Sequence, residues 1–147
     1  DRKLRGDRAP TALAMPTVDY RTWSGAFVLR ERLRATMLAA AGPLRTEKGL
    51  TAGLATLREL GEIWSERQAD DQQDLLEGLS TRNLFVVAEM VLHAAQLREE
   101  TRGSHYRADH PGRDDREWLV NTFVTKGPSE PNLQVRPVEL AYLRPEE

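Results

Sequence analysis

The chain has 147 residues, no cysteine, and 21 Lys and Arg against 23 Asp and Glu, which gives a formal net charge of -2. This length suffices for one domain with a single hydrophobic core, and the near-neutral charge provides no field that would gather nucleic acid or hold an anionic membrane surface. The absence of cysteine excludes disulfides, thiolate zinc sites and cysteine nucleophiles.

Residues 1–22 are expected to form a linker or arm that leads out of a preceding domain. They are charged at first and then carry Pro10 and Pro16 among small residues, without a sustained hydrophobic period. The chain begins at Asp1 and its first methionine is Met15, so we expect a fragment or a processed product.

Residues 23–103 are expected to form three helices. Ser24 can cap the first helix, and Gly42 with Pro43 ends it. Its apolar positions recur at roughly helical spacing: Phe27, Leu29, Leu33, Met37 and Ala40. Thr46 and Glu47 begin the second helix, which carries a heptad seam of Leu50, Leu54, Leu57, Gly61 and Trp64, widened by Leu60 and Ile63.

The third helix is predicted from about Gln73 to Glu100. Its middle is apolar nearly all round, so we expect it to be the most buried of the three. Its longest apolar run, Leu84 to Ala88, is far shorter than the roughly 20 residues that a membrane helix needs, and direct membrane insertion is not expected.

Residues 117–147 are predicted to contain a β-hairpin and a tail. The stretches Glu117–Gly127 and Asn132–Leu143 show alternating or β-branched patterns, and turn-forming residues lie between them. Pro137 should place the second strand at an edge or end its ladder. The expected fold is therefore mainly α: an antiparallel three-helix bundle, a charged connector at residues 104–116, and a small C-terminal hairpin.

The stretch TRGSHYRADHPGRDD, from Thr101 to Asp115, concentrates the residue types that act in active sites. One interpretation is a metal site, because His105 and Asp109 are four residues apart and His110 is adjacent, although no third convergent ligand is evident. A second is catalysis, with His105 as base, Asp109 as its orienting partner and Arg107 as an anion clamp. The favoured interpretation is a salt-bridged connector, because alternating arginine and aspartate can lock a segment that has no ladder of its own.

The same stretch resembles the carboxy-terminal region of the succinate dehydrogenase and fumarate reductase flavoprotein family, which includes L-aspartate oxidase. The family pattern is E-S-R-G-x-H-x-R-x-D-x-P-x-R-D-D followed by a tryptophan. It is matched here by Glu100, Arg102, Gly103, His105, Arg107, Asp109, Pro111, Arg113, Asp114, Asp115 and Trp118, whereas Thr101, Ala108 and His110 depart from it. The resemblance covers about Leu33 to Leu140, and the ending LQVRPVEL favours the succinate or fumarate branch.

The resemblance implies a helical domain that packs against the FAD-binding and capping domains of one polypeptide. FAD and the catalytic residues would lie in those domains, and no catalytic, FAD-binding or metal-binding residue is expected in these 147. An iron-sulfur subunit would be a partner, and the protein would be cytoplasmic, on the cytoplasmic face of the membrane through its partner subunits. Alternatives are the corresponding domain of L-aspartate oxidase and a free-standing helical interaction module.

Seven residues of the stretch are expected to position this domain against the FAD domain. They share the ability to form charged or hydrogen-bonded contacts in a segment without regular structure: Arg102, His105, Arg107, Asp109, Arg113, Asp114 and Asp115.

Overall fold

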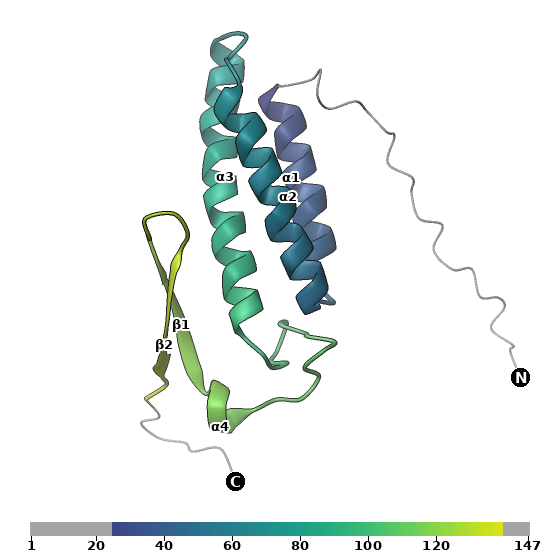
Figure 1. Cartoon of the computed structure of the whole chain (residues 1–147), viewed down its shortest axis with the longest axis vertical. Coiled ribbons are helices and arrows are strands. Elements are labelled where there is room, and N and C mark those ends of the chain that lie inside the picture. Colours follow the sequence, from purple (N-terminus) through teal and green to yellow (C-terminus); the bar gives the residue numbers. More distant parts are fainter. Residues whose placement is uncertain (1–24, 140–147) are drawn as a thin grey trace, which may run out of the picture.

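Three long helices lie side by side and antiparallel, and a small β-hairpin stands beside the third (Figure 1). The computed structural model describes residues 25–139. The elements in chain order are α1 (Ala26–Ala41), α2 (Glu47–Glu66), α3 (Gln72–Leu97), a four-residue helix α4 (Asp115–Trp118), β1 (Val120–Thr125) and β2 (Asn132–Pro137). The expected mainly α fold, a three-helix bundle with a C-terminal hairpin, is confirmed.

Helix α2 begins and packs as its sequence predicts. The Thr46 hydroxyl accepts a hydrogen bond from the Gly49 amide at 3.1 Å, which satisfies one of the free amides of the first turn. Leu50, Leu54 and Leu57 are buried in the core cluster together with Leu92 of α3 and residues of α1. The heptad spacing therefore marks the face of α2 that meets its two neighbours.

Helix α1 differs from its prediction in two respects. Ser24 and Trp23 lie outside the described residues, and the N-cap position is held by Gly25, which makes no side-chain bond. Instead, Asp74 of α3 accepts a hydrogen bond from the Ala26 amide at 2.9 Å, so a neighbouring helix satisfies this end. Phe27, expected on the core stripe, is 56% exposed, because the core face of α1 runs through Ala26, Leu29, Leu33 and Ala40.

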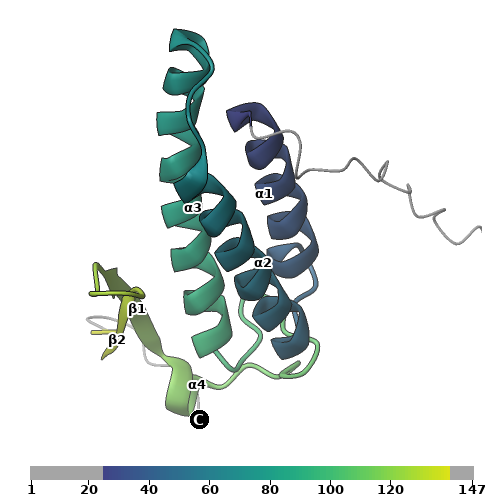
Figure 2. The same cartoon turned by 45° about the horizontal axis from the view of Figure 1, so that its top comes forward.

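The prediction that α3 is the most buried helix is wrong for the described residues. One face, which includes Ala88, Leu92 and Ala95, is buried against α1 and α2. The opposite side carries large apolar side chains that remain exposed, because three helices packed around one small core leave each helix one outer side. Figure 2 shows that only the hairpin approaches the outer side of α3, near its C-terminal half.

Close helix packing depends on Gly53 in α2. A Cβ atom added at this position would lie 2.5 Å from the Ala40 Cβ and 3.2 Å from the Leu92 Cδ1. The absence of a side chain at Gly53 lets the α2 backbone approach both other helices, which sets the spacing of the bundle.

The hairpin pairs antiparallel, with Val120 opposite Pro137 and Thr125 opposite Asn132. The second strand ends at Pro137, as predicted, because proline has no amide to continue the ladder. Both strands are shorter than the sequence patterns suggested. Among residues 25–139, no helix combines the length and the apolar character needed to cross a bilayer.

Candidate functional site

The charged connector lies across one end of the bundle, where α3 ends and the turn between α1 and α2 begins (Figure 1). Two backbone hydrogen bonds join it to that turn: the Arg45 amide donates to the Tyr106 carbonyl at 3.0 Å, and the Ala108 amide donates to the Arg45 carbonyl at 2.9 Å. Segments about sixty residues apart in sequence therefore form one short ladder, and the connector is fixed to the bundle by its backbone as well as by its side chains.

Arg107 is completely buried and points inward. Its Nη1 donates to the carbonyls of Ala95 at 3.0 Å, Gln96 at 3.1 Å and Arg98 at 3.2 Å, which are free acceptors at the end of α3. A guanidinium beside these carbonyls also places a positive charge at the negative end of the helix dipole. Arg107 thus caps α3 from a residue ten positions beyond the helix.

Asp109 holds the other edge of the Arg107 guanidinium. Its Oδ1 accepts from Nε at 2.8 Å and its Oδ2 from Nη2 at 3.0 Å, the two-point geometry that makes arginine–carboxylate pairs strong. Asp109 also accepts from the Glu47 amide at 2.6 Å, and the Glu47 carboxylate pairs with Arg107 at 3.2 Å. The Arg107 hydrogen bonds hold the pKa of Asp109 well below its usual range, so this carboxylate stays ionised in its pair with Arg107.

A second cluster surrounds Glu100, whose side chain is fully buried. Its oxygens accept from Arg102 Nε at 2.6 Å, from Arg98 Nη1 at 2.5 Å and from the Asp114 amide at 3.0 Å. Burial by itself would raise the pKa of Glu100, but the bonds from Arg102, Asp114 and Arg98 outweigh it and lower the pKa. Glu100 is therefore an ionised anchor with satisfied oxygens, unlike a catalytic carboxyl group kept protonated in an apolar pocket.

Arg98 joins the end of α3 to the hairpin. It donates to the carbonyls of Trp118 at 3.0 Å and Val120 at 2.7 Å, and its guanidinium lies 5.4 Å from the centre of the Trp118 ring. Asp114 caps α4 by accepting from the Arg116 and Glu117 amides. These contacts fix the direction in which the chain enters β1.

His105 is held as a neutral imidazole. Its Nδ1 lies 3.1 Å from Arg45 Nη1, which can only donate, so Nδ1 is the acceptor and Nε2 carries the proton toward the Arg98 carbonyl at 3.2 Å. Burial lowers the pKa of His105, and the nearby charges of Arg45, Arg107 and Arg98 lower it further. Asp109 is engaged by Arg107, and no hydrogen bond joins it to His105 among the described contacts, so the arrangement of a base with an orienting carboxylate is not formed.

The remaining predicted residues lie toward the surface. Arg113 is 59% exposed and pairs with Asp115 through two contacts of 2.8 Å. Asp115 also accepts from Arg102 at 2.7 Å, and the hydrogen bonds from Arg113 and Arg102 lower the pKa of Asp115. Within residues 25–139, no group of three His, Cys, Asp or Glu side chains could hold a metal ion.

The favoured interpretation from sequence, a salt-bridged connector, is confirmed by these contacts. Sequence reasoning overlooked Arg45, Glu47 and Arg98, and it included Glu100 only as part of the family pattern. The cluster contains equal numbers of cations and anions: Arg45, Arg98, Arg102, Arg107 and Arg113 against Glu47, Glu100, Asp109, Asp114 and Asp115. Such a balanced and internally paired set offers little charge to an outside ionic ligand.

The structure explains two positions of the family pattern, those of Gly103 and Thr101. Gly103 has φ +57°, a conformation that favours glycine, and it forms the tight turn in which Arg102 and His105 exchange backbone hydrogen bonds. The Thr101 hydroxyl accepts from the Arg107 amide at 3.0 Å and donates to the His110 carbonyl at 2.9 Å. A serine hydroxyl could make the same two bonds, so the departure at this position preserves the contact.

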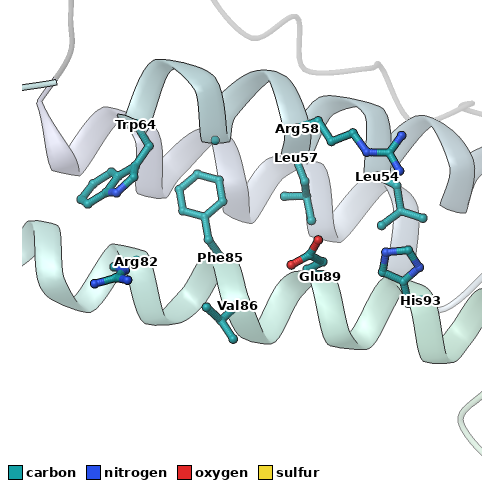
Figure 3. Close-up of a pocket in the computed structure, with 10 residues that line it drawn as sticks. Leu54, Leu57, Arg58, Trp64, Arg82, Phe85, Val86, Glu89 and His93 are labelled. Atoms are coloured by element: carbon teal, nitrogen blue, oxygen red, sulfur yellow. The ribbon is translucent and has the colours of Figure 1, made fainter. Parts of the chain in front are cut away.

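A groove between α2 and α3 is a second candidate site (Figure 3). It has a volume of about 250 Å³ and an apolar floor that includes Leu57, Trp64 and Phe85. The Trp64 and Phe85 rings lie 6.3 Å apart, and Glu89 and His93 project from α3 along the same groove. Arg58, on its rim, pairs with Glu130 of the hairpin turn at 2.8 Å. The aromatic pair stabilises the packing of α2 on α3.

Comparison with known proteins gives one family and a consistent set of relatives. The family model described as fumarate reductase flavoprotein C-term matches residues 30–147. A succinate dehydrogenase flavoprotein subunit of Rickettsia bellii is 32% identical over 126 residues, which are 80% of this chain and 21% of the relative. A fumarate reductase flavoprotein subunit of Mycobacterium tuberculosis is 33% identical over 101 residues, 65% of this chain and 17% of the relative.

Solved structures agree with this likeness. A quinol-fumarate reductase with menaquinol molecules superposes with a TM-score of 0.77 at 26% identity, over 82% of this chain and 22% of that one. An adenylylsulfate reductase of Archaeoglobus fulgidus shares the fold, with a TM-score of 0.74 at 23% identity over 79% of this chain and 20% of that one. The chain spans about a fifth of the length of the proteins that it matches.

Proposed function

The chain belongs to the fumarate reductase flavoprotein C-terminal family, and from this premise we propose that it is the helical C-terminal domain of an FAD-dependent succinate dehydrogenase or fumarate reductase flavoprotein subunit. The observation that carries the proposal is the match over residues 30–147, which includes the helices, the connector and the hairpin together. Relatives from both branches are similarly close, so the proposal covers both directions of the reaction.

In such a parent, flavin would accept or donate a hydride at a dicarboxylate. Dinucleotide folds hold the pyrophosphate at a glycine-rich turn between a parallel strand and a helix. Residues 25–139 contain an antiparallel hairpin and no such strand, turn and helix unit, so they do not fit FAD. We therefore assign no step of the reaction to these residues, and their proposed role is structural within the parent.

The connector is proposed to position this domain against the FAD domain. Its inner members, Arg107 and Glu100, are used by their own chain, so an interface role falls to the members nearer the surface, above all the exposed Arg113 and the half-buried Asp115. Their pairing leaves the two side chains preorganised at the surface, where a neighbouring domain could add further hydrogen bonds. In the parent, Arg113→Ala should reduce flavin retention while leaving the stability of the separate chain unchanged. Equal flavin content in variant and wild type would contradict this role.

We further propose an iron-sulfur subunit as partner and a location on the cytoplasmic face of a membrane, reached through partner subunits. Both relatives are named as flavoprotein subunits, which supports membership of a larger complex. Purification of the natural protein without detergent and with detergent, followed by iron analysis, tests both points. A flavoprotein that carries no iron-containing subunit under either condition would contradict the proposed partner.

The experiment that tests the function starts from the natural polypeptide, captured with an antibody to this domain. Its flavin absorbance and its reaction with succinate, fumarate and L-aspartate are then measured, with artificial electron carriers. A flavoprotein much larger than 16.6 kDa that reacts with succinate or fumarate is the expected result. Reaction with L-aspartate alone would replace the proposal by L-aspartate oxidase. A flavin-free product of about the size of this chain would replace it by a free-standing module.

A further inference from the structure

The outer side of α3 carries large apolar side chains that none of the described elements covers. Its residues lie on successive turns and each exposes between 40% and 55% of its surface. We call this set the outer face of α3: Leu76, Leu79, Leu84, Val87 and Val91. Scattered exposed apolar residues are ordinary, but a connected row along one helix marks an interaction surface.

The outer face also lacks charge. Between Leu75 and Leu97 the only charged residues are Glu77, Arg82 and Glu89. Arg82 and Glu89 lie along the groove toward α2 (Figure 3), away from the outer face. A helix turns by 100° per residue, which places Ser80 and Asn83 on the same side as the outer face, so the polar residues on this side are uncharged. A helix that met only water on this side would carry charged residues there.

A groove beside the outer face gives it shape. It lies between α1 and α3, has a volume of about 280 Å³, and is lined by Leu33 and Met37 from α1 and by Leu84, Val87 and Val91 from α3. Arg34 is the charged residue on its rim and pairs with Glu31 of its own helix at 2.9 Å. A large apolar side chain from another surface could enter this groove without burying a charge.

We infer that the outer face of α3, with the α1–α3 groove, is the surface on which the remainder of the parent flavoprotein polypeptide packs. This inference rests on the proposed function. The chain spans about a fifth of its relatives' length, so a large covalently linked body is available to cover the surface. Permanent interfaces are more apolar than transient ones, and a surface without charge fits a permanent neighbour.

Two other occupants can be distinguished from the parent polypeptide. A helix that lies on a membrane flanks its apolar side with Lys and Arg, whereas α3 carries Glu77 and Glu89 as well as Arg82. A second copy of the chain would protect the surface in a way that increases with protein concentration, whereas a covalently linked neighbour would not. The covering surface of the parent is expected to be apolar as well, with a projecting residue such as Leu or Phe seated beside Val87.

The absence of cysteine allows a direct test by thiol labelling. Val87→Cys places one thiol on the outer face, and Glu59→Cys places one on the exposed outer side of α2 as the matched control. Each is made in the separate 147-residue chain and in the parent protein, and maleimide labelling is followed over time by peptide mass spectrometry. The two thiols fall in different tryptic peptides, residues 83–98 and 59–67, so native cysteines elsewhere do not interfere.

The expected result is that the thiol at position 87 labels at least about tenfold more slowly in the parent than in the separate chain, because it becomes accessible only when the interface opens. The thiol at position 59 should keep its rate within about twofold. Equal rates at position 87 in the two proteins would overturn the inference. Protection of position 87 in the separate chain, increasing with its concentration or with added phosphatidylcholine and phosphatidylglycerol vesicles, would also overturn it.

Flavin content of the same parent preparation separates the two proposals. A flavoprotein with an unprotected position 87 leaves the proposed function intact and refutes the docking surface. A parent without flavin refutes the proposed function whatever the labelling shows. As a second variant, Val87→Glu should leave the melting temperature of the separate chain unchanged and reduce the yield of assembled parent. Normal assembly of the parent with Glu at this position would overturn the docking surface.

Discussion

Replacement of Arg107 by alanine is the sharpest test of the connector, because one side chain serves three acceptors at the end of α3 and two carboxylates. Its guanidinium donates to the Ala95, Gln96 and Arg98 carbonyls and pairs with Asp109 and Glu47. The substitution removes every one of these donors and leaves their acceptors in place.

The expected cost follows from burial. Breaking a buried ion pair by removing one partner costs about 3–5 kcal/mol. Asp109 keeps 30% of its side chain exposed and Glu47 keeps 53%, so water can solvate both carboxylates and reduce the penalty. We therefore expect a loss of about 3 kcal/mol in the free energy of unfolding, at the lower end of that range. Arg107→Lys should recover about half of the loss, because an ammonium keeps the charge and lacks the planar fork.

Urea unfolding of the 147-residue chain, followed by far-UV circular dichroism, measures this change by linear extrapolation. Arg113→Ala is the matched control: it removes an arginine of the same connector that is largely exposed, and it should leave the unfolding midpoint unchanged. A free energy for Arg107→Ala within about 0.5 kcal/mol of the wild type would refute the assigned cap on α3. Equal losses for both variants would show that burial is not what distinguishes the two arginines.

Three further outcomes are expected from the same chain. Gly53→Ala should destabilise the chain by about 1–3 kcal/mol because the new methyl group meets Ala40, whereas Gly61→Ala should stabilise it by up to about 1 kcal/mol because no atom lies within 4 Å of the added Cβ. Thermal melts that rank the two variants the other way would contradict the packing. Thr46→Ala should cost about 1 kcal/mol in urea, while Thr46→Ser should cost much less, and equal losses would argue against the cap. Burial lowers the folded-state pKa of His105, so the unfolded chain binds a proton at this residue more readily and stability should fall as the pH decreases below about 6.5. The fall should be shallower in His105→Gln, and identical pH profiles of melting temperature for the two proteins would exclude His105 as the cause.

The resemblance of the connector to a catalytic site is explained by the chemistry that the two share. Arginine, aspartate and histidine can bind substrates, and they can also satisfy carbonyls and carboxylates of their own chain. Here Arg107, Asp109 and Glu100 have their polar atoms engaged within the chain. The distinction between the two uses lies in the direction of the side chains, which composition does not reveal.

Much of the fold could be predicted because it depends on neighbours in sequence. The Thr46 cap, the end of α1 at Ala41 before Gly42, and the Leu50, Leu54 and Leu57 stripe each follow from the geometry of a single helix. The hairpin could be located from turn residues and from Pro137 in the same way. Patterns with a period of 3.6 or 2 residues are properties of the backbone, so they are visible before any tertiary contact is known.

The partners of the charged residues required the tertiary structure. Arg45 and Glu47 meet the connector across about sixty residues of sequence, and any of several arginines could have paired with Asp109 as far as local spacing shows. The apolar composition of α3 indicated burial on all sides, but only the packed bundle revealed which side meets α1 and α2 and which side stays open. Helix periodicity is a local property of the backbone, whereas the choice of ionic partners and of the covered face depends on how distant segments are brought together in space.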